Sequence, residues 1–172
     1  ETAFEKILKS TLKISGAERG FILVRDEEKK FGYAAGMDGH GRKLPLSHFQ
    51  TSHSVVNQVV ADGKPVFMVD ELQGKFAAQE SIVAMNLRAI ACLPLTGIPS
   101  QASEPSILGI LYLDSTMKMH SLSGLDQKII IRLALEAGNV LERVEMIKSI
   151  EQRKKLEQEL ALAEETQRSL LP

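Results

Sequence analysis

The sequence IIIRLALEAGNVL, residues 129–141, runs without a break into ERVEMIKSIEQRKKLEQELALAEETQRSLLP, residues 142–172. It contains no glycine after Gly138 and no proline before Pro172, so we expect one long helix. The first part is apolar on nearly all sides, as a helix packed against a sheet would be. The second part is charged and carries a narrow apolar stripe, which is typical of a two-helix seam. This helix is therefore predicted to begin in a core and to end in a coiled coil.

The stripe has heptad spacing near its end, at Leu156, Leu160, Ala163, Gln167 and Leu170. Continued backwards, the same steps reach Arg153, Ser149 and Met146, which make a poor seam, whereas Ile147 and Ile150 lie one residue out of phase. Such a shift is a local change of coiled-coil winding. Two interpretations stay open: a bistable seam that changes its pairing, or a weak, frayed linker. The residues predicted to form the dimer and signalling helix are Leu141, Val144, Ile147, Leu156, Leu160 and Leu170.

Composition limits the size and class of the domain. The chain has 172 residues, 44% of them hydrophobic, with a net charge of -1. Without the charged tail, roughly 135–145 residues remain, which is enough for one core. No basic face suggests DNA or an anionic membrane, and no apolar run approaches the ~18 residues of a membrane span. The single cysteine and the absence of a signal-peptide pattern predict a soluble, cytoplasmic domain. Because Glu1 already lies in helical sequence, we expect the segment to belong to a longer protein.

The rest of the chain alternates short apolar segments with short helical ones. An amphipathic helix opens it and stops near Ser15-Gly16. The predicted strands are residues 20–26, 31–37, 64–72, 88–95 and 106–115. Two short helices are predicted at residues 54–63 and 79–86, and the long helix should begin after Ser121 or Ser123.

Several of these strands are apolar on consecutive residues, most clearly FILV (21–24) and ILGILYL (107–113), which predicts a sheet that is covered on both faces. The first and last helices should together cover one face. The short helices and the loop of residues 37–53 should cover the other, with room for a cavity under that loop.

Four stretches resemble, in order and spacing, the GAF domain family of sensory modules. They are HSVVNQVVADGKPVFMVD (53–70), NLRAIACLPL (86–95), ILGILYLDS (107–115) and SLSGLDQKIIIRLALEAGNVLE (121–142). The resemblance implies an α+β fold, with a five- or six-stranded antiparallel sheet between a two-helix dimerisation layer and a ligand-pocket layer. We accordingly expect a GAF-like sensory domain at residues 1–145 and a coiled-coil linker at residues 146–172.

The last residues, LALAEETQRSLLP (160–172), resemble the junction that opens bacterial metal-dependent serine/threonine phosphatase domains of the SpoIIE-like type. This resemblance implies a phosphatase as a C-terminal effector in cis. Its metal-binding aspartates would lie beyond Pro172, so this segment itself is expected to be non-catalytic.

Pocket candidates come from the strands and helices of the predicted pocket layer, and most are apolar. Arg88 opens an apolar strand, where the family resemblance implies a role with the pocket helix or a ligand anion, and a salt bridge to Asp70 or Glu71 is the structural alternative. Asp70 can likewise cap the following amides or face the pocket. The candidates are Tyr33, Met37, Phe67, Val69, Asp70, Ile82, Val83, Met85, Leu87 and Arg88.

Several specific ligands are disfavoured by the residues present. The signature of cyclic-nucleotide-binding GAF domains is not matched at residues 114–127. No histidine pair has metal-site spacing, although one axial histidine, His48 or His53, would be enough for haem. Cys92 lies mid-strand, where it packs as a small hydrophobe rather than as an attachment point for a bilin.

The function expected is a homodimeric sensor that binds an unidentified small molecule and signals through its last helix. An interaction scaffold that binds nothing small is the alternative, and a haem or bilin sensor is a weaker one. No cofactor can be named, and neither nucleic acid nor membrane is an expected partner.

Overall fold

The computed structural model describes residues 1–68, 79–98, 105–117, 119 and 122–171. Within these residues, five strands form one sheet in the order β2-β1-β5-β4-β3, and every neighbouring pair is antiparallel. The strands are β1 (Arg19–Arg25), β2 (Phe31–Asp38), β3 (Val66–Met68), β4 (Ala89–Thr96) and β5 (Ile107–Ser115). The α+β class and the antiparallel sheet predicted from the sequence are confirmed.

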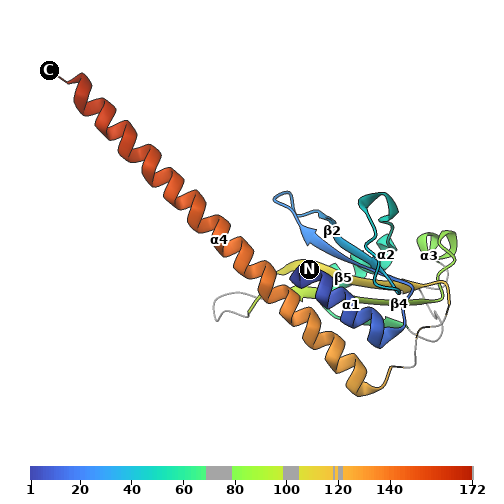
Figure 1. Cartoon of the computed structure of the whole chain (residues 1–172). Helices are drawn as coiled ribbons and strands as arrows, with labels where there is room; N and C mark the ends of the chain where they lie inside the picture. The colour runs from blue at the N-terminus through green and yellow to red at the C-terminus, as the bar shows by residue number, and fades with distance from the viewer. Residues whose placement is uncertain (69–78, 99–104, 118, 120–121, 172) are drawn as a thin grey trace.

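Helices lie on both faces of this sheet, as its consecutive apolar residues require. Within the described residues they are α1 (Ala3–Ser15), the 3₁₀ turn η1 (Leu46–His48), α2 (His53–Asp62), α3 (Glu80–Ala84) and α4 (Gly124–Leu170). In Figure 1, α1 and the first part of α4 lie together on one side of the sheet, with α2 on the other.

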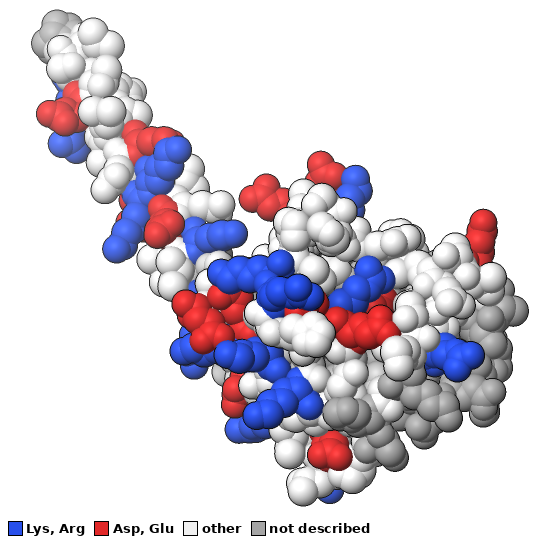
Figure 2. All heavy atoms as spheres, turned by 45° about the vertical axis from the view of Figure 1, so that its right-hand side comes forward, with Lys and Arg blue, Asp and Glu red and all other residues white. Residues whose placement is uncertain are grey.

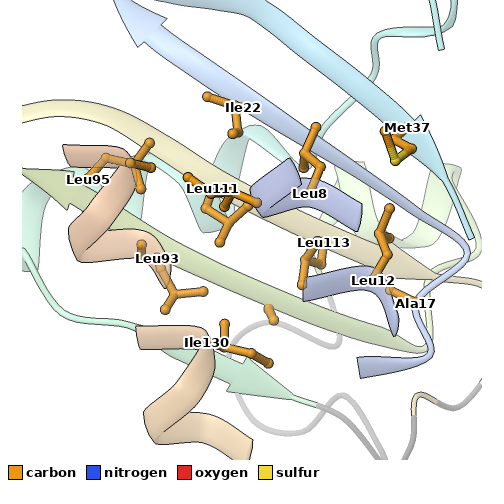
Figure 3. Packing of buried hydrophobic residues seen from close by; sticks show 14 of the residues in the cluster. Leu8, Leu12, Ala17, Ile22, Met37, Leu93, Leu95, Leu111, Leu113 and Ile130 are labelled. Atoms are coloured by element: carbon orange, nitrogen blue, oxygen red, sulfur yellow. The ribbon is translucent and has the colours of Figure 1, made fainter. Parts of the chain in front are cut away.

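The face under α1 and α4, here called the helix face, carries the larger apolar core. Figure 3 shows leucines of α1 converging with side chains of β1, β4 and β5 and with Ile130 of α4. The opposite face, here called the pocket face, is covered by α2, α3 and the segment that contains η1. Its core includes Phe21, Val55, Ile82, Ile90 and Tyr112.

Side-chain caps fix where the two outer helices begin. Thr2 and Glu5 form a reciprocal capping box at the start of α1, and Gly16 ends that helix in the left-handed conformation. Ser123 and Asp126 form the same box at the start of α4, which selects Ser123 from the two predicted caps.

One close backbone contact places α4 on the sheet. A Cβ atom on Gly138 would overlap the carbonyl oxygen of Thr96, where the pairing of β4 with β5 shifts register. One turn later, Glu142 accepts a hydrogen bond of 2.8 Å from the backbone N–H of Ile98. These contacts hold α4 against the end of β4 just before the helix leaves the domain.

Beyond Glu142 the side chains of α4 are exposed as far as Leu171. This part of α4, here called the tail, projects away from the sheet and its covering helices (Figure 1). Charged residues of both signs are interspersed on the face of the molecule seen in Figure 2. Among the described residues, no helix is long and apolar enough to cross a membrane.

Candidate functional site

The pocket face has a ring cluster at its centre. The fully buried Phe21 of β1 meets Phe49 edge-on, with ring centroids 5.4 Å apart. Phe49 follows η1 and also meets Tyr33 of β2, at 5.7 Å. The Tyr33 hydroxyl donates a hydrogen bond of 2.6 Å to the carbonyl oxygen of Leu44. These contacts fasten the segment after β2 onto the sheet, so it is a packed cover in the described structure.

A buried chain of hydrogen bonds joins this cover to the sheet. The backbone N–H of Ser52, the residue just before α2, donates to the Tyr112 hydroxyl at 3.0 Å. That hydroxyl in turn donates to Asp114 Oδ2 at 2.8 Å. Arg19 grips the same carboxylate with two N–H groups, at 2.6 Å to Oδ1 and 2.9 Å to Oδ2. The pocket-layer helix α2 is thereby tied through β5 to the start of β1.

The electrostatics of this chain follow from its burial. The Asp114 side chain is 1% exposed and the Arg19 side chain 25% exposed. Burial raises the pKa of Asp114, and its hydrogen bonds with Arg19 and Tyr112 oppose that shift. Burial alone would lower the pKa of Arg19, but the neighbouring Asp114 outweighs it and raises that pKa. Burial also raises the pKa of Tyr112 well above its ordinary value, so the hydroxyl keeps its proton and remains a donor.

A separate surface groove of about 610 Å³ lies between the end of α1 and the turn after β2. Its rim is charged, unlike the apolar pocket expected from the sequence. Lys13, Glu18, Asp38 and Arg42 contribute its charges, and His40 lies among them. Burial would raise the pKa of Asp38, but hydrogen bonds from Arg42 and from the His40 backbone lower it.

The family model of the GAF domain matches residues 1–141. The chain belongs to the GAF domain family. The match covers the sheet, the helices on both of its faces and the part of α4 that packs on the sheet. No curated protein matches the sequence significantly.

Solved structures share the GAF fold at low sequence identity. GAF3 from Slr1393 of Synechocystis, in its photoproduct state, has a TM-score of 0.64 and 9% identity, with 86% of this chain and 96% of that chain covered. A GAF domain/HD domain protein from Geobacter sulfurreducens has a TM-score of 0.59 and 12% identity, covering 84% and 92%. A domain of a two-component sensor histidine kinase protein from Sinorhizobium meliloti has a TM-score of 0.53 and 14% identity, covering 88% and 94%. GAF domains form a sensory and signalling family, and these neighbours include a photoreceptor and a sensor kinase.

The GAF fold brings several of the predicted pocket residues to the pocket face. Ile82 and Leu87 are buried there, and Tyr33 and Met85 pack against the same cluster while partly exposed. Val69 and Asp70 lie outside the described residues.

Two predicted pocket residues lie on the wrong side of the sheet. Met37 is buried in the core of the helix face, and Phe67 packs against the same core. Phe67 pairs with Ala91, which belongs to that core as well. Alternation along each strand sends the neighbours Val66 and Met68 to the pocket face instead. The assignment of Met37 and Phe67 to the pocket layer is therefore corrected.

Val83 and Arg88 are exposed rather than turned into the pocket-face core. Val83 is 64% exposed on α3. The backbone N–H of Arg88 donates to the carbonyl oxygen of Ser115, which fixes the start of β4 beside the end of β5. The salt bridge suggested for Arg88 would involve residues outside the described part of the chain.

The Arg19–Asp114–Tyr112 chain was missed by sequence reasoning. A signal for it exists, because Arg19 and Asp114 are the charged ends of two apolar strand segments. These two residues are Cα partners in the antiparallel pair of β1 and β5. Opposite charges at such ends would have predicted an ion pair, had the pairing of the two strands been known.

The residues weighed for haem, bilin or metal are not assembled into a site. Cys92 is fully buried on the pocket face, and desolvation raises its pKa far above the ordinary range. His40, His48 and His53 are exposed. Within the described residues, no group of three potential ligands could hold a metal ion.

The predicted seam residues divide at the end of the domain. Leu141 is 5% exposed because it packs into the helix-face core, so it is corrected to a core residue. Val144 and Ile147 are exposed, as are Leu156, Leu160 and Leu170 farther along the tail.

Proposed function

We propose that this GAF domain is a non-catalytic sensory module that binds a small molecule and passes the signal through a dimeric α4 to a C-terminal effector. The observation that carries the proposal is the continuity of α4. One helix of 47 residues starts at a cap beside the sheet, packs on β4 and β5, and continues into an exposed tail. A change in how the domain holds the helix is therefore passed to the tail with no flexible joint between them.

The contacts at the domain exit suit such transmission. Gly138 lets α4 approach the backbone of Thr96, and Glu142 binds the N–H of Ile98. A shift in the end of β4 would move both contacts together. The following helix would then rotate or translate as a rigid body.

The ligand site would lie between the sheet and the cover of the pocket face, near Tyr33, Ile82, Met85 and Leu87. These side chains form an apolar wall, and Tyr33 adds one hydroxyl, so a largely apolar small molecule is the chemical class favoured. Occupancy would have to favour one arrangement of the cover, because only differential affinity shifts a conformational equilibrium.

Homodimerisation is supported by the apolar stripe on α4. Val144 and Ile147 are 41% and 56% exposed just beyond the domain, in the part of the stripe where two copies would pair. A solitary helix with such a stripe gains by burying it against a second copy. By resemblance of residues 160–172, the effector proposed is a SpoIIE-like protein phosphatase that follows in cis.

A scaffold that binds no small molecule is the second candidate. It is favoured by the tight filling around Phe21, Phe49 and Tyr112, whose rings and hydroxyl are already partnered. The haem or bilin sensor finds no support from the buried Cys92, although the neighbours include photoreceptors.

Native mass spectrometry of the purified chain, with an absorbance spectrum of the same sample, tests the proposal. A dimer with a reproducible extra mass that is lost on mild activation would support the sensor, and visible absorbance would identify a chromophore. A dimer whose mass stays equal to that of the bare chain after incubation with metabolite extracts would favour the scaffold. A monomer at micromolar concentration would contradict the dimeric part.

A further inference from the structure

The distal tail presents an apolar face that is flanked by acidic residues. In the heptad that places Leu160 at position a, the seam residues from Leu156 to Leu170 occupy positions a and d. The flanking positions e and g hold Glu157, Glu159, Glu164 and Thr166. No lysine or arginine occupies a flank in this interval.

This face is open in the described structure. Leu156, Leu160 and Leu170 are 65%, 62% and 79% exposed. A shallow groove runs along the same part of α4 and is lined by Glu159, Leu162, Ala163, Thr166, Gln167 and Leu170. Apolar and acidic groups therefore share a single surface on the last turns of the helix.

A second copy is a poor occupant of this face. In a parallel pair, Glu159 of one helix lies beside Glu164 of its partner, and the reverse contact repeats the repulsion. In an antiparallel pair the same flanks also meet acidic residues. Like charges across a helix interface cost free energy in either orientation. Pairing of two copies is thus favoured nearer the domain, at Val144 and Ile147, and opposed farther along.

We infer that the distal face, residues 156–170, is a docking surface for a basic amphipathic helix of a partner, with apolar residues in its seam and lysine or arginine in its flanks. Such a helix would bury the exposed leucines and place its cations beside Glu157, Glu159 and Glu164. The inference rests on the proposed signalling role of α4 and specifies the partner of that surface. Docking would compete with pairing of the two distal tails. The partner would therefore bind only when the distal tails are unpaired.

The full chain can be tested with two synthetic three-heptad peptides that carry leucine in the seam and differ only in their flanks. One has lysine at the flanks and the other glutamate, and both carry a fluorophore for anisotropy. At ~20 mM salt the lysine peptide should bind roughly tenfold more tightly, because several cross-helix ion pairs add. At ~500 mM salt the difference should shrink, because exposed charges are screened.

Matched variants separate flank charge from total charge. Glu159→Gln with Glu164→Gln removes two flank charges, whereas Glu151→Gln with Glu165→Gln removes two charges from the opposite side of the tail. Only the first double variant should lose the preference for the lysine peptide. Equal binding of both peptides, no binding of either, or equal effects of the two double variants would overturn the inference.

The proposed dimer is tested separately in the same samples. An Ile147→Cys chain reports pairing near the domain by disulfide cross-linking, and Leu160→Cys reports pairing of the distal tails. Failure of the Ile147→Cys cross-link contradicts the dimeric sensor. The peptide experiment still tests the docking surface, because it does not depend on pairing near the domain. Efficient cross-linking of the second at low salt overturns the inference, because the acidic flanks would then not oppose self-pairing.

Discussion

At the scale of single residues, the Tyr112 hydroxyl makes two buried hydrogen bonds. It accepts the N–H of Ser52 and donates to Asp114, whose other hydrogen bonds come from Arg19. These hydrogen bonds lie on the pocket face beneath the start of α2. A ligand that moves α2 would therefore stretch or break them first. The Tyr112 hydroxyl therefore contributes both to the stability of the fold and to the proposed response of α2 to a ligand.

Replacing Tyr112 by phenylalanine should lower the free energy of unfolding by about 1–3 kcal/mol, because a buried donor and acceptor are lost together. The matched change Tyr33→Phe removes a part-buried hydroxyl with one partner and should cost about 1 kcal/mol or less. Urea unfolding followed by circular dichroism measures both. An equal cost for the two variants would show that the Tyr112 chain adds nothing beyond an ordinary hydrogen bond.

The Cys92 thiol gives a second residue-level prediction. The thiolate is the reactive form, and burial both hides the sulfur and raises its pKa. Ellman's reagent at mildly alkaline pH should therefore leave the native protein unmodified and titrate one thiol after unfolding in urea. Rapid labelling of the native chain would mean that the pocket face opens to solvent, which the present packing opposes.

At the scale of elements, Gly138 sets two effects against each other. Alanine is the better helix former, by about 1 kcal/mol in a helix interior. A Cβ at position 138 would, however, overlap backbone atoms of Thr96 that cannot move without shifting β4. Steric overlap of this kind costs about 1–3 kcal/mol, so we expect Gly138→Ala to destabilise the domain.

Gly124→Ala is the control, because a Cβ there would meet no other atom within 4 Å. It should leave the melting temperature unchanged or raise it slightly. Thermal unfolding at equal protein concentration compares the two variants. A stabilised Gly138→Ala protein would mean that α4 does not rest on β4 as described.

The elements themselves were largely predictable, because each apolar segment is bounded by turn residues or a cap. The strand predicted at 20–26 is observed at Arg19–Arg25, and that predicted at 88–95 at Ala89–Thr96. The faces were harder to predict. The described part of β3, Val66–Met68, is apolar at all three positions, so its sequence shows no polar–apolar alternation to indicate which side Phe67 occupies.

Long-range pairing explains the other omission. Arg19 and Asp114 are 95 positions apart, and only the register of β1 against β5 makes them partners. The sequence contains both charges but not the register, so the buried chain at the candidate site was not predicted. Leu141 was misassigned for a related reason, since helical spacing alone does not say where the sheet stops covering α4.

At the scale of the whole molecule, the family match ends at residue 141, the last residue of α4 that is buried in the core. Within the described part of the chain, the helix then continues to Leu170 with every residue from Arg143 onward exposed. The part of α4 that packs in the domain and the exposed tail are thus one continuous helix. The pairing of the tail depends on what contacts its apolar stripe, and that stripe changes phase between Ile150 and Leu156.

Cysteine scanning of α4 predicts two regimes along that stripe. Single substitutions at Val144 and Ile147 should cross-link two chains readily under mild oxidation, and those at Leu156 and Leu160 weakly at low salt. Raising the salt should increase the distal cross-links, because it screens the acidic flanks. The native thiol adds no background, since Cys92 is fully buried.

Glu151→Cys and Glu165→Cys, on the side of the tail opposite the seam, are the controls and should not cross-link at either salt concentration. Non-reducing gels quantify all six variants in parallel. If a bound small molecule is found, the same scan with and without it tests the switch directly. A distal cross-linking pattern that changes with neither salt nor ligand would contradict signalling through the tail. A helix can transmit a signal only if the signal changes the balance between two of its arrangements.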